Sequence, residues 1–403
     1  MVGLGFPIST LSNGSGYGTI PRCRVYDLNV SAFVPQQSPN RIPAVCFGTK
    51  NSSSTVVAFA ILMVFVALPL LISSGVHAAV SPAVDSAGDY LMRQRYERAK
   101  DFAARRRAED PSDIRALYAY FTVRHTQILD YESYAVHGEE FLRFLDTAMT
   151  IVENSLSSGS PVDTVRHLFY LGNILGSKGI IQAKTGKWFR AAKTATRSVA
   201  MLREAKKRDS TFLAALLGVG LFNYYLSQNL GWVPFFKDRT EEGLRDIVAA
   251  TEAEFPYDYA AMNAYCWILI ERAEYVRADS IAREVLADYP RNTIFLRIAA
   301  RSTLMNEKFD KALRDGRRLR DLTLEREGAL RNWSDLLMAY EVMATAALEL
   351  NRPHEALRIA REALEKEVPM WAQKIDHVQN HWSYLTEMEK KLDKGGIEDA
   401  LSE

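Results

Sequence analysis

The sequence predicts an all-α protein in which antiparallel helix hairpins stack into a right-handed α-solenoid between residues 85 and 393. Three observations support this prediction. Apolar residues recur at the spacing of an amphipathic helix from Asp85 onward. Gly and Pro are sparse beyond residue 80, and no alternating strand pattern is found there. An aromatic residue, a small residue and a Pro also recur together at a regular interval, which indicates an internal repeat.

The composition excludes several classes of protein. Of 403 residues, 48% are hydrophobic and 25% are charged, which is typical of a globular chain. The 50 basic and 49 acidic residues give a net charge of +1, so no nucleic-acid partner is expected. The cysteines Cys23, Cys46 and Cys266 form no CxxC pair, so neither a disulfide framework nor a zinc knuckle is predicted.

Residues 1–54 differ from the rest of the chain. They are rich in Ser, Gly, Pro and Asn, they show no helical period, and their only acidic residue is Asp27. We interpret them as a disordered extension that results from a start codon assigned too far upstream. A transit-type extension is the alternative, because such segments are also rich in Ser and poor in acidic residues.

Residues 55–79 form an apolar segment of the kind that directs export. No charged residue occurs between Lys50 and Asp85, and the run from Val56 to Ile72 is interrupted only by Pro69. The small residues around Ala78 and Ala79 predict a signal peptide that is cleaved between these two alanines. The alternative is an uncleaved membrane anchor, with membrane association through residues 55–72. Both interpretations place the body outside the cytoplasm, in the periplasm or held at the membrane.

The body is predicted to be helix after helix. The first helical segment runs from Asp85 to the break at Asp110-Pro111-Ser112, where Ser112 is expected to cap the next helix. Further helices are expected at 113–129, 137–157, 162–184, 187–208, 211–228, 239–253, 257–272, 275–288, 293–305, 309–325, 332–350, 353–367 and 370–393. Residues 394–403 are expected to be a flexible tail.

The repeat is clearest in the second half of the chain. Tyr275 precedes Ala278 by three positions and Pro290 follows it by twelve; Phe309 and Ala312 repeat the pattern at 312 − 278 = 34. The small residue is predicted to let the two helices of a hairpin approach, and the Pro to end the second helix. Further repeat positions are Ala99, Ala191, Gly243, Pro256 and Ala356.

These residues resemble the tetratricopeptide repeat (TPR), whose hairpins also recur every 34 residues or so. The family's Trp and Gly-Tyr positions are largely missing; Met262, Tyr265, Cys266 and Leu269 stand there instead. The family's peptide-binding residues therefore cannot be transferred to this chain. The stretch 160–305, with GVGLFNYYLSQNLGWVPFF and YPRNTIFLRIA, is similar to bacterial TPR proteins and to the mitochondrial outer-membrane protein 39 family. That resemblance implies a helical array with a scaffold role and no catalytic residues.

An aromatic insertion between two predicted helices is the first candidate binding site. Such side chains either fold back over the core or form a patch that faces a ligand or a membrane. The candidate binding residues are Asn223, Tyr224, Tyr225, Trp232, Phe235 and Phe236.

Two other features of the sequence are candidates for reactive sites. His377 and His381 share a helix face at metal-chelating spacing, but Val378 stands where a zinc protease needs its Glu. We interpret them as a solvated or capping pair. Cys266 lies in an apolar helix face and is interpreted as a buried structural thiol. No catalytic residue, metal or cofactor is predicted.

The expected function is a non-catalytic scaffold of the cell envelope that binds a protein or peptide. Its concave face would present side chains from the first helix of each hairpin. The alternative is a lipid or small-molecule carrier in which the aromatic insertion near 229–237 acts as the gate.

Overall fold

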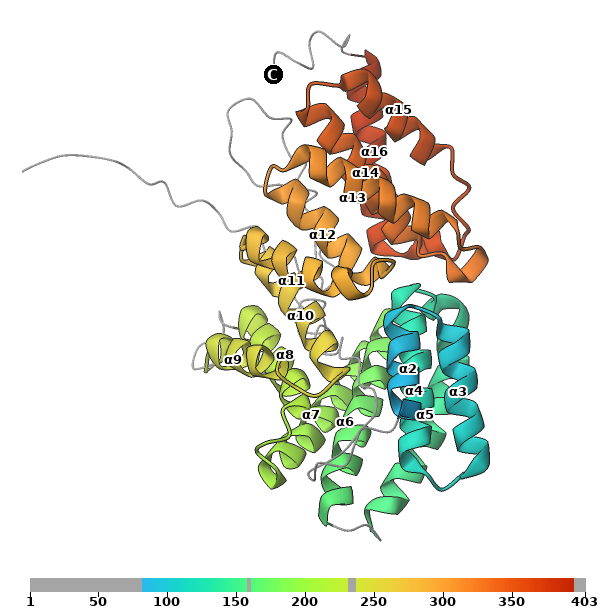
Figure 1. The fold of residues 1–403 in the computed structure, drawn as a ribbon, viewed down its shortest axis with the longest axis vertical. Helices are drawn as coiled ribbons and strands as arrows, with labels where there is room; N and C mark the ends of the chain where they lie inside the picture. The colour runs from blue at the N-terminus through green and yellow to red at the C-terminus, as the bar shows by residue number, and fades with distance from the viewer. Residues whose placement is uncertain (1–81, 158–160, 231–236, 395–403) are drawn as a thin grey trace, which may run out of the picture.

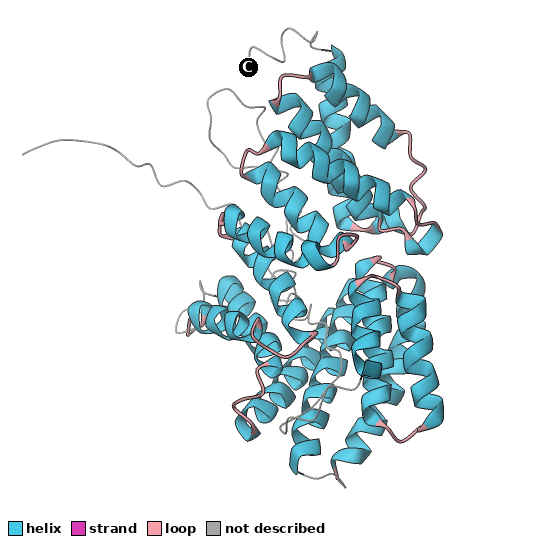
Figure 2. Ribbon diagram, in the orientation of Figure 1, coloured by secondary structure: helices cyan, strands magenta, loops and turns pink. Residues whose placement is uncertain are grey.

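The computed structural model describes residues 82–157, 161–230 and 237–394. Within these ranges all regular secondary structure is helical and no strand occurs (Figure 2). The predictions for residues 1–81, including the signal peptide and its cleavage site, lie outside the described residues. No described helix is both long enough and apolar enough to cross a membrane. The all-α solenoid predicted from the sequence is confirmed (Figure 1).

Consecutive helices pair as hairpins, and each hairpin packs on the next. We number the seven described hairpins from α2–α3 (hairpin 1) to α14–α15 (hairpin 7), and α16 covers the last one. The helices are α2 (Pro82–Met92), α3 (Tyr96–Glu109), α4 (Ile114–Asp130), α5 (Tyr134–Leu156), α6 (Pro161–Lys184), α7 (Trp188–Arg208), α8 (Ala214–Leu230), α9 (Thr240–Ala250), α10 (Tyr257–Glu271), α11 (Tyr275–Asp288), α12 (Thr293–Met305), α13 (Phe309–Leu324), α14 (Trp333–Glu349), α15 (Pro353–Leu364) and α16 (Asp376–Lys394).

Six of these hairpins share one turn between their two helices. In hairpin 5, Ala273 has φ = 61°, its N–H donates to the Ile270 carbonyl (3.0 Å), and the Glu274 N–H donates to the Leu269 carbonyl (2.8 Å). This left-handed residue closes the first helix, and the second helix begins two positions later. We call the edge of the solenoid formed by these turns the turn edge. Its left-handed residues are Gln94, Glu132, Gly186, Ala273, Glu307 and Asn351.

Two details of the N-terminal prediction are wrong. The segment from Asp85 to Glu109 is two helices, because Gln94 adopts a left-handed conformation (φ = 54°) and reverses the chain. Ser112 does not cap the next helix. Asp113 occupies the N-cap, where its carboxylate accepts the Arg115 N–H at 2.9 Å.

The last helix also begins later than predicted. The prediction was residue 370, whereas α16 begins at Asp376. A single turn of 3-10 helix, Ala372–Lys374, precedes it after Pro369. The apolar spacing was helical, but the pattern did not resolve the chain reversal between α15 and α16.

The predicted repeat positions lie where the two helices of a hairpin meet. Ala278 is fully buried, and its carbonyl oxygen is 3.7 Å from the Cys266 thiol of the partner helix. At Gly243 a Cβ atom would lie 2.5 Å from the Tyr224 nitrogen and 2.6 Å from the Gly220 oxygen, so α8 and α9 touch through their backbones. Among the others, Ala99, Ala191, Ala312 and Ala356 are buried, Tyr275 and Phe309 are partly buried, and Pro256 and Pro290 follow the second helices of their hairpins.

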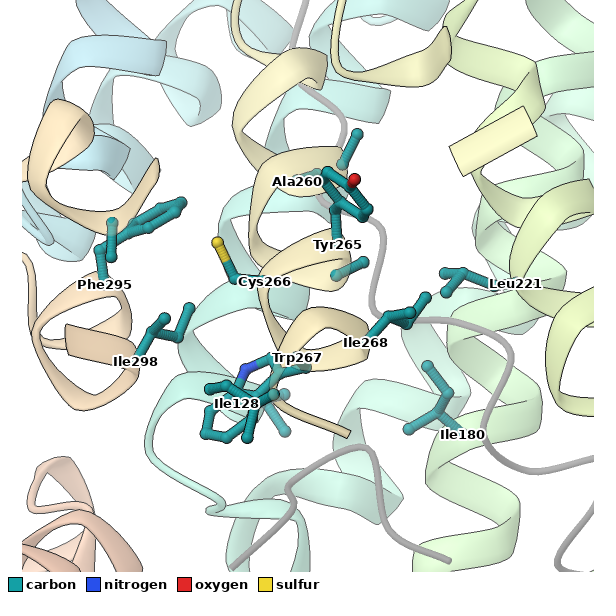
Figure 3. Close-up of a cluster of buried hydrophobic side chains, with 14 of the residues drawn as sticks. Ile128, Ile180, Leu221, Ala260, Tyr265, Cys266, Trp267, Ile268, Phe295 and Ile298 are labelled. Carbon is teal, nitrogen blue, oxygen red and sulfur yellow. The ribbon is translucent and has the colours of Figure 1, made fainter. Parts of the chain in front are cut away.

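Helix α10 lies at the centre of the core. Figure 3 shows its Trp267 and Ile268 within a cluster of buried side chains from four other first helices. These neighbours are Ile128 of α4, Ile180 of α6, Leu221 of α8, and Phe295 and Ile298 of α12. In α14, every residue from Trp333 to Ala344 is buried. The first helices are therefore largely enclosed, contrary to the expected mechanism in which they present side chains along a concave face.

The solenoid closes on itself. Hairpins 1 and 2 lie against hairpins 6 and 7, so contacts recur after five hairpins (Figure 1). We call this interface the seam. Its residues are Met92, Gln94, Asp130 and Glu132 on one side and Asn292, Thr293, Arg297, Arg326, Asn332, Ser334 and Asp335 on the other.

Candidate functional site

The first three residues of the predicted binding set lie on α8 with their side chains buried in the protein. Asn223, Tyr224 and Tyr225 are each at most 5% exposed. The Asn223 side-chain oxygen accepts a hydrogen bond from Arg203 at 3.0 Å, and the two tyrosine rings meet edge to face at 5.0 Å. The role of these residues in binding stays a prediction. Trp232, Phe235 and Phe236 lie outside the described residues.

A partly buried carboxyl group lies beside this cluster. The Tyr225 hydroxyl donates to Glu271, the last residue of α10, at 3.2 Å. Burial raises the pKa of Glu271 to about 8, because a charged carboxylate is poorly solvated there and the tyrosine hydroxyl compensates only in part. Glu271 is therefore mostly protonated at neutral pH and forms part of the contact between hairpins 4 and 5.

Two apolar side chains stand out on the turn edge nearby. Phe189 is 93% exposed and Val276 is 67% exposed. Each lies three positions after the left-handed residue of its hairpin, Gly186 or Ala273. They therefore occupy equivalent places in hairpins 3 and 5.

An ion-paired residue precedes each of these two apolar residues by a few positions in the sequence. Lys187 contacts Glu139 of hairpin 2 at 2.6 Å, and Arg272 contacts Glu241 of hairpin 4 at 3.2 Å. The turn edge of hairpins 3 and 5 thus presents one exposed apolar side chain in each hairpin, with an ion-paired residue a few positions before it. The same edge of hairpins 1 and 2 carries the polar residues Gln94 and Glu132, which are buried in the seam.

The histidine pair is internal. His377 and His381 are 3% and 1% exposed, so the interpretation as solvated residues is wrong. His381 Nδ1 lies 2.6 Å from one oxygen of Glu341, and the other oxygen accepts from Arg301 at 2.9 Å. The described residues contain no group of three possible metal ligands.

Cys266 is also enclosed. Its thiol is fully buried, and burial raises its pKa far above the usual range, which suppresses the reactive thiolate.

Sequence reasoning missed Phe189, Glu271 and the Arg301–Glu341–His381 group. A signal for Phe189 was present, because Trp188-Phe189 occupies the aromatic slot of the repeat with one aromatic ring more than the hairpin needs. The buried charges carried no such signal. Each looks like an ordinary polar position on a helix, and its partner lies in a different hairpin.

Comparison with known proteins finds likeness at the level of structure. The chain matches no protein-family model and no curated protein. A TPR protein from Parabacteroides merdae aligns with 75% of this chain and 97% of its own, at 14% identity and a TM-score of 0.35. The TPR domain of P58(IPK) aligns with 79% of this chain and 100% of its own, at 14% identity and a TM-score of 0.21. Likenesses this loose transfer no residue, and the resemblance to mitochondrial outer-membrane protein 39 stays a prediction.

Proposed function

We propose that this protein is a non-catalytic scaffold that binds a partner protein through the turn edge of hairpins 3 and 5. The observation that carries the proposal is the 93% exposure of Phe189. An aromatic ring held at a fixed helix terminus and left in water is the type of side chain that anchors protein interfaces.

The surroundings of Phe189 support this use. Val276 adds a second exposed apolar side chain two hairpins along the same edge. The Lys187–Glu139 and Arg272–Glu241 pairs form a polar surround of the kind found at the rim of interfaces. Individually exposed apolar residues are common, so it is the equivalent placement of these two that favours a docking surface.

Paired substitutions test the proposal. The double variant Phe189→Ser, Val276→Ser is compared with Met370→Ser, which alters an 80% exposed side chain outside the turn edge. We expect the wild type and Met370→Ser to capture the same cross-linked partner from native extract, and the double variant to lose it. Equal capture by all three proteins would contradict the proposed surface.

A carrier function is the second candidate, and one observation favours it. The side-chain oxygen of Asn229, at the end of α8, is buried and accepts no hydrogen bond from the part of the chain that the structure describes. A bound ligand with a hydrogen-bond donor would satisfy it. Native mass spectrometry of the purified chain tests this candidate. A small molecule that is retained by the wild type and lost in Asn229→Leu would support it, and an unliganded mass for the wild type would contradict it.

We also propose export with cleavage between Ala78 and Ala79, on the strength of the sequence pattern alone. The intact mass of protein isolated from its native cells tests this. An N-terminus at Ala79 is expected, and a retained 55–79 segment would favour the membrane anchor.

A further inference from the structure

The same type of contact occurs twice in the seam: an asparagine that caps one helix donates a hydrogen bond to the last carbonyl group of another helix. Asn292 caps α12 by accepting the Phe295 N–H, and its amide donates to the Met92 carbonyl at 2.8 Å. Asn332 caps α14 by accepting the Asp335 N–H, and its amide donates to the Asp130 carbonyl at 2.7 Å. In each case the C-terminal end of a helix, α2 or α4, meets the N-terminal end of another, so partial charges of opposite sign face each other.

Side chains around these caps tighten the seam. Gln94 donates to Asp130 at 2.7 Å and accepts from the Thr293 backbone at 3.0 Å. Ser334 donates to Glu132. The Gln94–Thr293 and Ser334–Glu132 bonds span 199 and 202 positions of sequence, whereas the Ser177–His125 bond between adjacent hairpins spans 52. The seam thus holds together parts of the chain that are not neighbours in the solenoid.

Charged groups in the seam are unequal in number. Asp130, Glu132 and Asp335 supply three carboxyl groups, against the guanidinium groups of Arg297 and Arg326. Arg297 contacts Asp335 at 3.0 Å and Asp130 at 3.4 Å, and Arg326 contacts Asp130 at 3.7 Å. Counted over these five groups alone, the negative charges outnumber the positive ones by one when all three carboxyl groups are ionised.

The seam differs in balance from the interfaces between successive hairpins. Those interfaces are mainly apolar, whereas the seam adds to shared core residues such as Ile128 and Ile298 a dense set of buried hydrogen bonds and ions, whose desolvation cost offsets much of their attraction. Each hairpin of a solenoid is held mainly by its neighbours, so small rotations at several hairpins add up to a large displacement at the ends. The seam can therefore open while every hairpin stays folded.

We propose that the seam is a reversible latch, which detaches hairpins 1 and 2 from hairpins 6 and 7 as the pH rises from acid to neutral. The titrating group is Asp335, at the start of α14. It faces Asp130 and Glu132 at the end of hairpin 2's first helix and Arg297 of α12. Arg326 lies behind Asp130, together with the hydroxyls of Tyr96 and Tyr131.

The direction of the effect follows from burial. Burial raises the pKa of Asp335 to about 7, against an ordinary value near 4 once the latch opens. A carboxyl group whose pKa is raised in the closed form stabilises that form at low pH, and this contribution is lost as pH rises through about 4 to 7. The population of the open form should rise by up to about tenfold per pH unit in that window and level off above it.

Hydrogen exchange measured on the full chain tests the latch. The amides at the N-terminal ends of α12 and α14 are followed from pH 5 to pH 8, after correction for intrinsic exchange rates, with the turn at Asn351 as internal reference. We expect seam opening to increase toward pH 7 in the wild type and to lose this dependence in Asp335→Asn. Unchanged pH dependence in Asp335→Asn would overturn the proposal. So would core amides of α10 that open together with the seam, since this would mean global unfolding.

A second variant keeps the test independent of Asp335. Asn332→Asp retains a good capping residue but loses the donor to Asp130 and adds a charge beside three carboxyl groups. We expect faster exchange in the seam at every pH. The matched control Asp113→Asn changes the N-terminal cap of α4. This cap lies at the end of α4 that is not part of the seam, so the seam should be unaffected. Seam exchange in Asn332→Asp equal to that of the wild type would contradict the proposal. Neither measurement requires a partner protein, so both are independent of the proposed binding function.

Discussion

Two glutamates show how neighbours decide the charge of a side chain. Glu271 has the Tyr225 hydroxyl as its hydrogen-bond donor, and burial raises its pKa to about 8. For Glu341 burial also acts to raise the pKa, but His381 and Arg301 outweigh it and the pKa falls below its usual value. Glu271 is therefore mostly neutral at neutral pH, whereas Glu341 is ionised.

The neutral acid predicts a pH dependence of stability. Because the pKa of Glu271 is raised in the folded state, its contribution is greatest below pH 4.5 and is lost as pH rises toward about 8. Glu271→Gln keeps the acceptor for Tyr225 and removes the titration. As pH rises over this range, the free energy of unfolding should fall more steeply in the wild type than in the variant. The difference between the two slopes is expected to be up to about 1.4 kcal/mol per pH unit. Urea unfolding at several pH values measures it, and identical slopes would contradict the assignment.

The ionised acid predicts a large penalty for neutralisation. Glu341→Gln would remove the carboxylate that pairs with Arg301, whose side chain is 2% exposed. We expect a loss of about 3–5 kcal/mol in the free energy of unfolding. Arg317→Gln, which breaks the more exposed pair with Glu355, is the matched control and should cost about 1 kcal/mol or less. Similar losses in the two variants would show that the Arg301–Glu341–His381 group is not buried as described.

At the scale of elements, charge and close backbone contact fix which hairpins are neighbours. On the outer helices Arg283 of α11 pairs with Asp315 of α13, and Lys311 of α13 pairs with Asp279 of α11. Each such pair contributes little stability. Together they favour one order and register of stacking, because a shifted hairpin would bring like charges together.

Gly243 offers a direct test of helix approach within a hairpin. In Gly243→Ala the new methyl group would overlap the backbone of α8 at Tyr224 and Gly220, with an expected cost of about 1–3 kcal/mol. Gly179→Ala is the control, because there the nearest atom to a Cβ, the Ala191 oxygen, is at an ordinary 3.5 Å. That change should be neutral or stabilising by up to about 1 kcal/mol, owing to the higher helix propensity of Ala. Thermal unfolding compares the two, and equal effects would refute the close contact of α8 and α9.

The helices themselves were largely predictable, since their apolar stripes and flanking Pro residues are local signals. The expected and observed ends of α11 and α12 agree, at 275–288 and 293–305. The break at Gln94 was not predictable in this way. Gln94 occupies the same left-handed position as Ala273 and Glu307 in their turns. None of these three residues is the Gly that normally marks a left-handed helix end, so the sequence carries no turn signal there.

At the scale of the whole molecule, the chain is a solenoid that returns to itself after five hairpins. The amides of Asn292 and Asn332 make the same contact with hairpins 1 and 2, at sequence separations of 200 and 202. The sequence could not predict this closure, because every residue involved is a plausible surface or cap residue within its own helix. The candidate site was partly predictable, because Phe189 belongs to a recognisable repeat. Its exposure was not predictable, because it depends on which edges of the solenoid the closure covers.

A distance measurement across the seam tests this closure most directly. Arg95 and Arg291 are exposed, and each adjoins a seam residue, Gln94 or Asn292. Spin labels at these two positions, with Cys23 and Cys46 replaced by Ser and the buried Cys266 retained, report the separation of hairpins 1 and 6 by electron–electron resonance at acid pH. A closed solenoid predicts a short distance with a narrow distribution, and a long or broad distribution would show that hairpins 1 and 6 do not meet.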